Sequence, residues 1–251
     1  MQTARVIQVR IRQLHGWDVE LPEALELQRR LSRRVMIRPF EKTPRLVAGV
    51  EAAYEIRGDR LWAAAVVFDL KEDRIIEELT VRDCVKTAYR PGLLAFREGP
   101  ALLEVCRRIR SDPEVLIFDG HGLLHPRRLG MASHMGLFLE KPTVGCAKSA
   151  LYREVEAPGK EFGERTAIME NGAVLGYALR TRSGVKPVYV SPGHLMDADS
   201  AVRVILQCVR GMRLPEPLRR AHHRAGAQRG ADTADAPCAP GSNDSSRRTG
   251  N

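Results

Sequence analysis

The sequence predicts an α/β domain with a mixed central sheet, an antiparallel meander plus parallel strands, and helices on both faces. Three strand-like segments within residues 46–82 are separated only by short turn signals, which is typical of an antiparallel meander. After them, short apolar runs alternate with segments of helical spacing, which is typical of a mixed sheet covered by helices. With 251 residues, 43% of them apolar, the chain is long enough to bury a substantial core.

The first half of the chain supplies a helix, the meander and a second helix. Apolar side chains at helical spacing follow Pro22, and Pro39 ends that pattern. The turn signals Gly58-Asp59 and Glu72-Asp73 divide the following apolar residues into strands. We therefore expect a helix at 25–35, strands at 46–55, 60–70 and 74–82, and a helix at 99–110.

The second half alternates short buried runs with helical segments. The run at 115–118 is too short for a helix and follows Asp112-Pro113, so it predicts a strand. By the same reasoning we expect a helix at 130–139, a strand at 143–147, strands around 168–179 and 187–190, and a closing helix at 197–210.

The composition changes after Arg224. The last 27 residues contain no aromatic residue and no Val, Ile, Leu or Met, so they have little to bury. We expect residues 1–224 to form one domain and residues 225–251 a disordered tail.

Charge and hydropathy limit the function classes. The formal net charge is +9, and the charges of the tail cancel, so the surplus belongs to residues 1–224 and favours a polyanionic partner. The longest uncharged apolar run, residues 61–68, is too short to span a bilayer, which excludes an integral membrane protein and a membrane partner. The five cysteines include no C-x-x-C pair, so no zinc knuckle is predicted and we expect a cytoplasmic protein.

Three carboxylates break the local pattern. Glu51 interrupts a strand of small and apolar residues, where an unpaired charge is costly to bury; alternatively it faces solvent. Asp119 ends the buried run 115–118 and precedes Gly120, a position where open sheets place active groups, although Asp-Gly is also an ordinary turn. Glu98 either belongs to the same site or lies only in the first turn of the next helix, where its negative charge interacts favourably with the helix dipole. Together the three would form an oxygen-rich site for Mg²⁺, with Mn²⁺ as a substitute.

Nitrogen-bearing side chains follow other short apolar runs. Lys148 and His194 each lie just beyond a buried run, where either could position water or balance phosphate charge. His121 and His125 lie in the glycine-containing loop after Asp119. The alternative is that these histidines are ordinary surface residues, as we expect for His222 and His223, which lie among basic residues.

The segment Tyr89-Arg90-Pro91-Gly92 has two interpretations. An aromatic residue before a rigid turn can act as a wedge between stacked bases. Alternatively, the four residues form only a capped turn.

At the level of motifs, the chain resembles the endonuclease V family. The resemblance covers about residues 25–210 and is carried by Tyr89-Arg-Pro-Gly-Leu-Leu-Ala-Phe-Arg-Glu98, Phe118-Asp-Gly-His-Gly-Leu-Leu-His-Pro-Arg-Arg-Leu-Gly130, Pro142-Thr-Val-Gly-Cys-Ala-Lys148 and Val190-Ser-Pro-Gly-His194. It implies a ribonuclease H-like fold and a magnesium-dependent hydrolysis of the second phosphodiester bond 3′ to deoxyinosine, leaving a 3′-hydroxyl and a 5′-phosphate. The implied partner is DNA that contains deoxyinosine, and we expect a monomer.

The resemblance also implies roles for individual residues. Asp119 and Glu98 match the metal-site carboxylates of the family, Lys148 its lysine near the scissile phosphate, and His194 its histidine beside the attacking water. Tyr89 and Pro91 match the strand-separating wedge. The residues that match the pocket for the everted base are Gly92, Leu94, Gly120 and His125.

One position departs from the family. Where relatives carry aspartate in the first strand, this chain has Glu51, which keeps the charge but adds a methylene. Because Mg²⁺ requires near-octahedral geometry, the change could weaken the ion, favour Mn²⁺ or abolish cleavage. Two alternatives therefore accompany the nuclease: an inosine-binding protein that has lost cleavage, and a ribonuclease acting on inosine-containing RNA.

Overall fold

The computed structural model describes residues 9–55, 59–85, 90–151 and 154–231. The helices within these residues are α1 (Leu21–Ser32), α2 (Leu94–Arg107), α3 (Met131–Leu139), α4 (Ala198–Gln207) and α5 (Glu216–Ala231). The strands are β1 (Leu46–Tyr54), β2 (Arg60–Asp69), β3 (Arg74–Cys84), β4 (Val115–Phe118), β5 (Thr143–Ala147), β6 (Arg165–Glu170), β7 (Ala173–Leu179) and β8 (Val188–Pro192).

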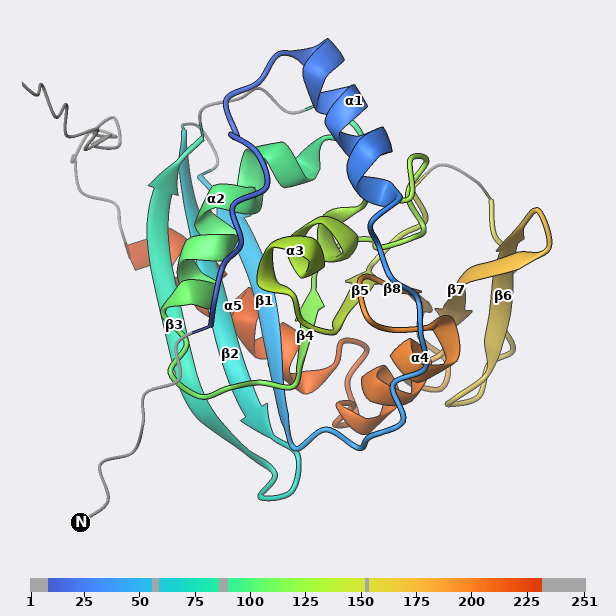
Figure 1. Cartoon of the computed structure of the whole chain (residues 1–251). Coiled ribbons are helices and arrows are strands. Elements are labelled where there is room, and N and C mark those ends of the chain that lie inside the picture. The colour runs from blue at the N-terminus through green and yellow to red at the C-terminus, as the bar shows by residue number, and fades with distance from the viewer. Residues whose placement is uncertain (1–8, 56–58, 86–89, 152–153, 232–251) are drawn as a thin grey trace, which may run out of the picture.

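The strands form one mixed sheet in the order β3-β2-β1-β4-β5-β8-β7-β6 (Figure 1). The first three strands are an antiparallel meander, and β4 and β5 extend it in parallel with β1. The last three strands are antiparallel to their neighbours. The predicted mixed sheet is confirmed, and the carboxyl ends of β1, β4 and β5 lie at the same edge.

Helices cover both faces of the sheet, and alternate residues of β1 face opposite cores. Ala48 and Val50 belong to the core beneath α2 and α3, whereas Val47 belongs to the core shared with α4 and Leu218 of α5. Figure 1 shows α2 and α3 in front of the sheet and α5 behind it. Because side chains alternate along a strand, neighbouring residues of β1 contact different helices.

Helix α2 begins at Leu94, earlier than the expected start at residue 99. Gly99 and Pro100 suggested a helix start, but both lie inside the helix, where Phe96, Leu103 and Cys106 continue one buried face. Packing of that face outweighs the cost of an internal proline. Glu98 is therefore part of a buried helix face and not a residue of an exposed first turn.

The segment expected as a strand at 168–179 is a hairpin, β6 and β7. Asn171 and Gly172 form its turn, and both have positive φ values, 51° and 79°. Two-residue hairpin turns require such values, and Asn-Gly is the pair that adopts them most readily.

Helix α5 continues to Ala231, past residue 224 where the composition predicted the domain to end. Leu218, Ala221 and Ala225 are fully buried along one side of it. This buried face was not predicted, because it consists mainly of alanine, and a segment rich in Ala and Gly has the composition of a disordered tail. Residues 232–251 lie outside the described part of the chain.

Within the described residues, none of the helices combines the length and the apolar character needed to cross a membrane.

Candidate active site

Three strands deliver charged side chains to the same edge of the sheet. Glu51 lies in β1, Asp119 directly follows β4, and Lys148 directly follows β5. In the parallel register Val50 pairs with Phe118, and Phe118 pairs with Gly145. The carboxylates of Glu51, within β1, and Asp119, just beyond β4, are therefore neighbours.

Lys148 bridges the two carboxylates. Its Nζ lies 2.8 Å from Oδ2 of Asp119 and 3.3 Å from Oε1 of Glu51. Burial alone would lower the pKa of Lys148, but the two negative charges raise it, so the ammonium group stays protonated. The bridge holds a positive charge at the strand ends.

Glu51 is buried, at 5% exposure, and only one of its oxygens has partners. Oε1 contacts Lys148 and also lies 3.0 Å from Nδ1 of His222 in α5, whereas Oε2 is buried with no hydrogen-bond partner. Burial, followed by the charge of Asp119, raises the pKa of Glu51 to about 9. The alternative that Glu51 faces solvent is wrong.

Glu98 reaches the same region from α2. The hydroxyl of Tyr54, in β1, donates a 2.6 Å hydrogen bond to Oε1 of Glu98, and the guanidinium of Arg97 lies 4.6 Å from the centre of the Tyr54 ring. Burial is the main cause that raises the pKa of Glu98 to about 7, and the charge of Asp119 contributes. The two faces of β1 thus position different partners, since Glu51 meets α5 and Tyr54 meets α2.

The donor set fits a hard divalent cation. An unpaired, buried oxygen of Glu51 and the adjacent carboxylate of Asp119 are ligands that Mg²⁺ and Mn²⁺ prefer. A cation would offset the burial, and the charge of Asp119, that raise the pKa values of Glu51 and Glu98. No three His, Cys, Asp or Glu side chains among the described residues stand close enough together to form a complete metal cluster. Glu51 and Asp119 are the pair that fits best.

The loop after β4 forms a small pocket beside Asp119. The four residues expected to hold the everted base, Gly92, Leu94, Gly120 and His125, all line it, together with Gln28 of α1, and its volume is about 70 Å³. Gly92 and Gly120 have φ values of 78° and 132°, which glycine adopts without strain. The structure brings these residues together, and glycine lets a ligand approach the backbone.

His125 is fixed as a neutral imidazole in this pocket. Its Nε2 donates to the carbonyl of Gly92 at 3.0 Å, and its Nδ1 accepts from the backbone N–H of Arg127 at 3.2 Å. Burial, followed by the charge of Arg127, lowers the pKa of His125 to about 4. The neighbouring His121 also lines the pocket, and burial lowers its pKa to about 4 as well.

The structure corrects the assignment of His194. This residue follows β8, which runs antiparallel to β5, so it lies at the start of β5 and not at the end that carries Lys148. Its Nδ1 accepts from the backbone N–H of Met36 at 3.2 Å, and its own N–H donates to Oγ1 of Thr143. His194 therefore ties a connecting segment to the sheet, away from the carboxylates.

His222 was expected at the surface, and it is exposed there. Its contact with Glu51 from α5 was not predicted from the sequence. The helical spacing of Leu218, Ala221 and Ala225 was the signal that could have revealed a packed helix with His222 beside its buried face.

The expected wedge is described only in part. Tyr89 lies outside the described residues, and Pro91 is exposed in the turn before α2. The wedge role of both residues stays a prediction.

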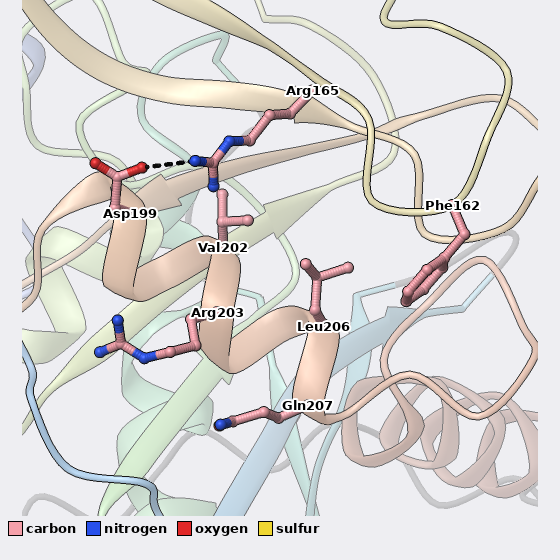
Figure 2. A pocket seen from close by; sticks show the side chains of 7 residues that line it. All are labelled: Phe162, Arg165, Asp199, Val202, Arg203, Leu206 and Gln207. Atoms are coloured by element: carbon pink, nitrogen blue, oxygen red, sulfur yellow. Dashed lines mark ion pairs between the residues drawn. The ribbon is translucent and has the colours of Figure 1, made fainter.

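A second hollow lies far from these residues along the sheet, between α4 and the loop that carries Phe162 (Figure 2). Its charged side chains already have partners, because Arg165 pairs with Asp199 at 3.2 Å and Arg203 donates to the carbonyl of Phe40. Its volume is about 690 Å³, and it is open to solvent.

The fold and the site together define a class of protein. A sheet ordered β3-β2-β1-β4-β5, with one carboxylate on β1 and another at the end of β4, is that of a ribonuclease H-like nuclease. Comparison with known proteins identifies the family within this class. The Endonuclease V family model matches residues 29–223.

Individual relatives agree with this match. An Endonuclease V of Methanothrix thermoacetophila is 45% identical over 216 residues, which are 85% of this chain and 94% of that protein. The crystal structure of the Bacillus subtilis Endonuclease V is 32% identical, with a TM-score of 0.83 over 88% of this chain and 98% of that one. The chain belongs to the Endonuclease V family, the deoxyinosine-specific endonucleases of DNA repair.

A further solved structure shares the fold at lower identity. The Ciona intestinalis Endonuclease V, in complex with a 24mer DNA containing an inosine followed by a ribo-adenosine, is 24% identical with a TM-score of 0.75 and covers 84% of this chain and 98% of its own.

Proposed function

We propose that this protein is a metal-dependent nuclease that hydrolyses the second phosphodiester bond 3′ to deoxyinosine and leaves a 3′-hydroxyl and a 5′-phosphate. One observation carries the proposal. The paired carboxylates Glu51 and Asp119, bridged by Lys148, lie directly beside the glycine-lined pocket, because Asp119 and Gly120 are consecutive. The Ciona intestinalis complex, in which a protein of this fold binds inosine-containing DNA, supports the same substrate.

Each residue of the site then has a role in the reaction. Glu51 and Asp119 would hold Mg²⁺, and Glu98, kept in place by Tyr54, would complete the acidic site. When bound, such an ion neutralises phosphate charge and assists the attack of water on phosphorus. Lys148 places its ammonium group where a scissile phosphate meets the carboxylates, and His222 orients or deprotonates the attacking water next to Glu51.

The pocket supplies recognition. An everted base that enters it meets the backbone at Gly92 and Gly120 and the neutral imidazole of His125. Because both nitrogens of His125 already hold backbone partners, the loop is kept rigid and its amides read the base edge. The wedge at Tyr89 and Pro91 would fill the gap that the base leaves in the duplex.

The test is single-turnover cleavage of an end-labelled duplex with one deoxyinosine, in Mg²⁺ and then in Mn²⁺. We expect a nick at the second 3′ bond from the natural protein and none from Asp119→Ala, with inosine binding retained. A variant Asp119→Ala that still cuts at the natural rate would overturn the metal-site assignment.

The same assay with Glu51→Asp separates the nuclease from a protein that only binds inosine. A nick from the natural protein shows that glutamate serves as a ligand. No nick from the natural protein, with activity in Glu51→Asp and equal binding by both, would mean that this chain recognises inosine without cutting it. A matched strand with ribo-inosine distinguishes DNA from RNA as substrate.

A further inference from the structure

Helix α1 links the base pocket to an exposed row of arginines. The Gln28 side chain is 1% exposed; its Nε2 donates to the carbonyl of Gly92 at 2.9 Å, and its Oε1 accepts from Nε of Arg127 at 2.5 Å. Arg127 also donates to the carbonyl of Gly92 at 3.0 Å. Gln28 therefore fixes Arg127 at the rim of the pocket and fixes α1 against the same rim.

The residues that follow Gln28 continue this positive charge along the surface. Arg29 and Arg33 are exposed, and they lie one helical turn apart, about 6 Å along the axis. Partial burial lowers the pKa of Arg127, and the positive charge of the nearby Arg29 lowers it further. Arg127, Arg29 and Arg33 thus form a strip that starts at the pocket and runs along α1.

The strip lacks the carboxylates that neutralise arginines elsewhere in the molecule. Arg29 has a 3.7 Å contact with Glu26, in which both side chains are more than 60% exposed, so the contact contributes little. No acidic side chain in the described ranges forms an ion pair with Arg33 or Arg127. The hollow of Figure 2 is the contrasting case, because its Arg165 pairs with the carboxylate of Asp199 at 3.2 Å. A row of guanidinium groups without counter-charges is suited to bind phosphates.

The position of the strip indicates which phosphates it meets. Two different residues connect the pocket to its surroundings: Gly120 follows Asp119 of the acidic site, and Gln28 belongs to α1. None of the hydrogen bonds of Glu51, Asp119 or Lys148 described above involves α1, so α1 and the carboxylates lie on different sides of the pocket. If the scissile bond lies 3′ to the lesion, the strand leaves the pocket toward the carboxylates on its 3′ side. The 5′ side then leaves toward α1.

We propose that Arg127, Arg29 and Arg33 bind the backbone phosphates of the strand immediately 5′ of the everted base. This inference rests on the proposed function and adds a second anchoring site to it. The strip holds the strand without reading its sequence, since phosphate contacts position a nucleic acid and base contacts specify it.

The experiment compares Arg29→Ala/Arg33→Ala with the natural sequence, both in an Asp119→Ala background that binds without cutting. Binding of an inosine-containing single strand is measured by fluorescence anisotropy over a range of salt concentrations. Each phosphate contact contributes about 0.7 to the slope of log K against log salt on a single strand, so we expect the slope to decrease by about 1.4 and the affinity at 0.1 M salt to fall about tenfold. The preference for inosine over adenine stays unchanged.

Lys71→Ala/Arg74→Ala is the charge-matched control. Both residues are exposed at the β2–β3 turn, at the opposite end of the sheet from Glu51, and we expect the slope to stay within 0.3 of the natural value, about half of one phosphate contact. An equal loss in this control would show that only net charge matters and would overturn the proposal. Circular dichroism and melting temperatures of both double variants should match those of the parent, which checks that the substitutions leave the fold intact.

Shortened strands test the 5′ assignment. On a strand with no nucleotides 5′ of inosine, the Arg29→Ala/Arg33→Ala variant should bind as tightly as its parent, whereas removal of the 3′ flank should leave the difference intact. The reverse pattern would overturn the assignment. Failure of the proposed function is a separate result, because it appears as the absence of a nick in the single-turnover assay of the natural protein, whatever the binding of the arginine variants.

Discussion

Glu51 has a basic partner on each of two different elements, and one of them is the histidine of α5. We expect His222→Ala to lower the single-turnover cleavage rate at least tenfold, because a water-orienting or general-base side chain typically contributes about 10²–10⁴-fold. His223→Ala is a matched control one residue along the same helix, and it should keep the natural rate.

His194→Ala tests the corrected assignment in the same assay. Since its imidazole accepts from the backbone of Met36 at the far end of β5, we expect a lower melting temperature with a cleavage rate within threefold of natural. A loss of cleavage that matches His222→Ala, in a protein that melts normally, would restore the role that the sequence motif suggested.

Tyr54 controls the charge of Glu98 through one hydrogen bond. This bond favours the ionised carboxylate and so opposes the burial that raises the pKa of Glu98 to about 7. In Tyr54→Phe the pKa rises further, and the acidic limb of the pH–rate profile should move to higher pH by about half a unit to one unit. Tyr177→Phe removes a similar bond to Asp199 away from the site and should leave the profile unchanged.

Residues at strand ends could be predicted, and the residue on α5 could not. Asp119 and Lys148 each follow a short apolar run, and the end of a buried strand is a position that sequence alone defines. His194 also follows such a run, but its strand is antiparallel to β5, and strand direction is a property of the sheet that spacing does not reveal. His222 gave no local signal of its contact with Glu51, because it is exposed and its neighbours in the sequence are charged or small.

At the scale of elements, Gly49 determines how closely α5 approaches β1. A Cβ at this position would lie 2.2 Å from the backbone carbon of Pro217, so Gly49→Ala must move the helix that carries His222. We expect a loss of about 1–3 kcal/mol in unfolding free energy and a parallel loss of cleavage, measured by urea denaturation and by the single-turnover assay.

Gly226→Ala is the matched control in α5. No atom lies within 4 Å of the Cβ it would add, and alanine favours helix by up to about 1 kcal/mol over glycine. This variant should be as stable as the natural protein or more so, with full activity. If Gly49→Ala behaved in the same way, the close packing of α5 on β1 would not matter for the site.

Among the elements, strongly patterned segments could be predicted and weakly patterned ones could not. The meander and the run at 115–118 were clear because Val, Ile and Leu are bounded by turn residues. Helix α5 presents Ala221 and Ala225 to its neighbours, which allow a close approach but supply little hydrophobic pattern. Helix α2 was expected too late because Pro100 normally marks a helix start.

At the scale of the whole molecule, the buried carboxyls make stability depend on pH. Folding raises the pKa of Glu98 from 4.5 to about 7, so its contribution is fully present below pH 4.5 and is lost as the pH rises through 7. The test compares the unfolding free energies of the natural protein and Glu98→Gln in EDTA. The difference between them should fall, to the disadvantage of the natural protein, by about 3 kcal/mol between pH 4.5 and pH 8. If chemical denaturation gave the natural protein and Glu98→Gln the same pH dependence of unfolding free energy, ionisation of Glu98 would cost the folded protein no stability.

The contact between His222 and Glu51 spans 171 positions of the sequence. During synthesis on the ribosome, β1 emerges early and α5 among the last elements, so the sheet edge carries its carboxylates well before the histidine arrives. With the role proposed for His222, an unfinished chain lacks part of its active site until α5 docks on β1. Hydrolysis of nucleic acid would then begin only after this late helix is in place.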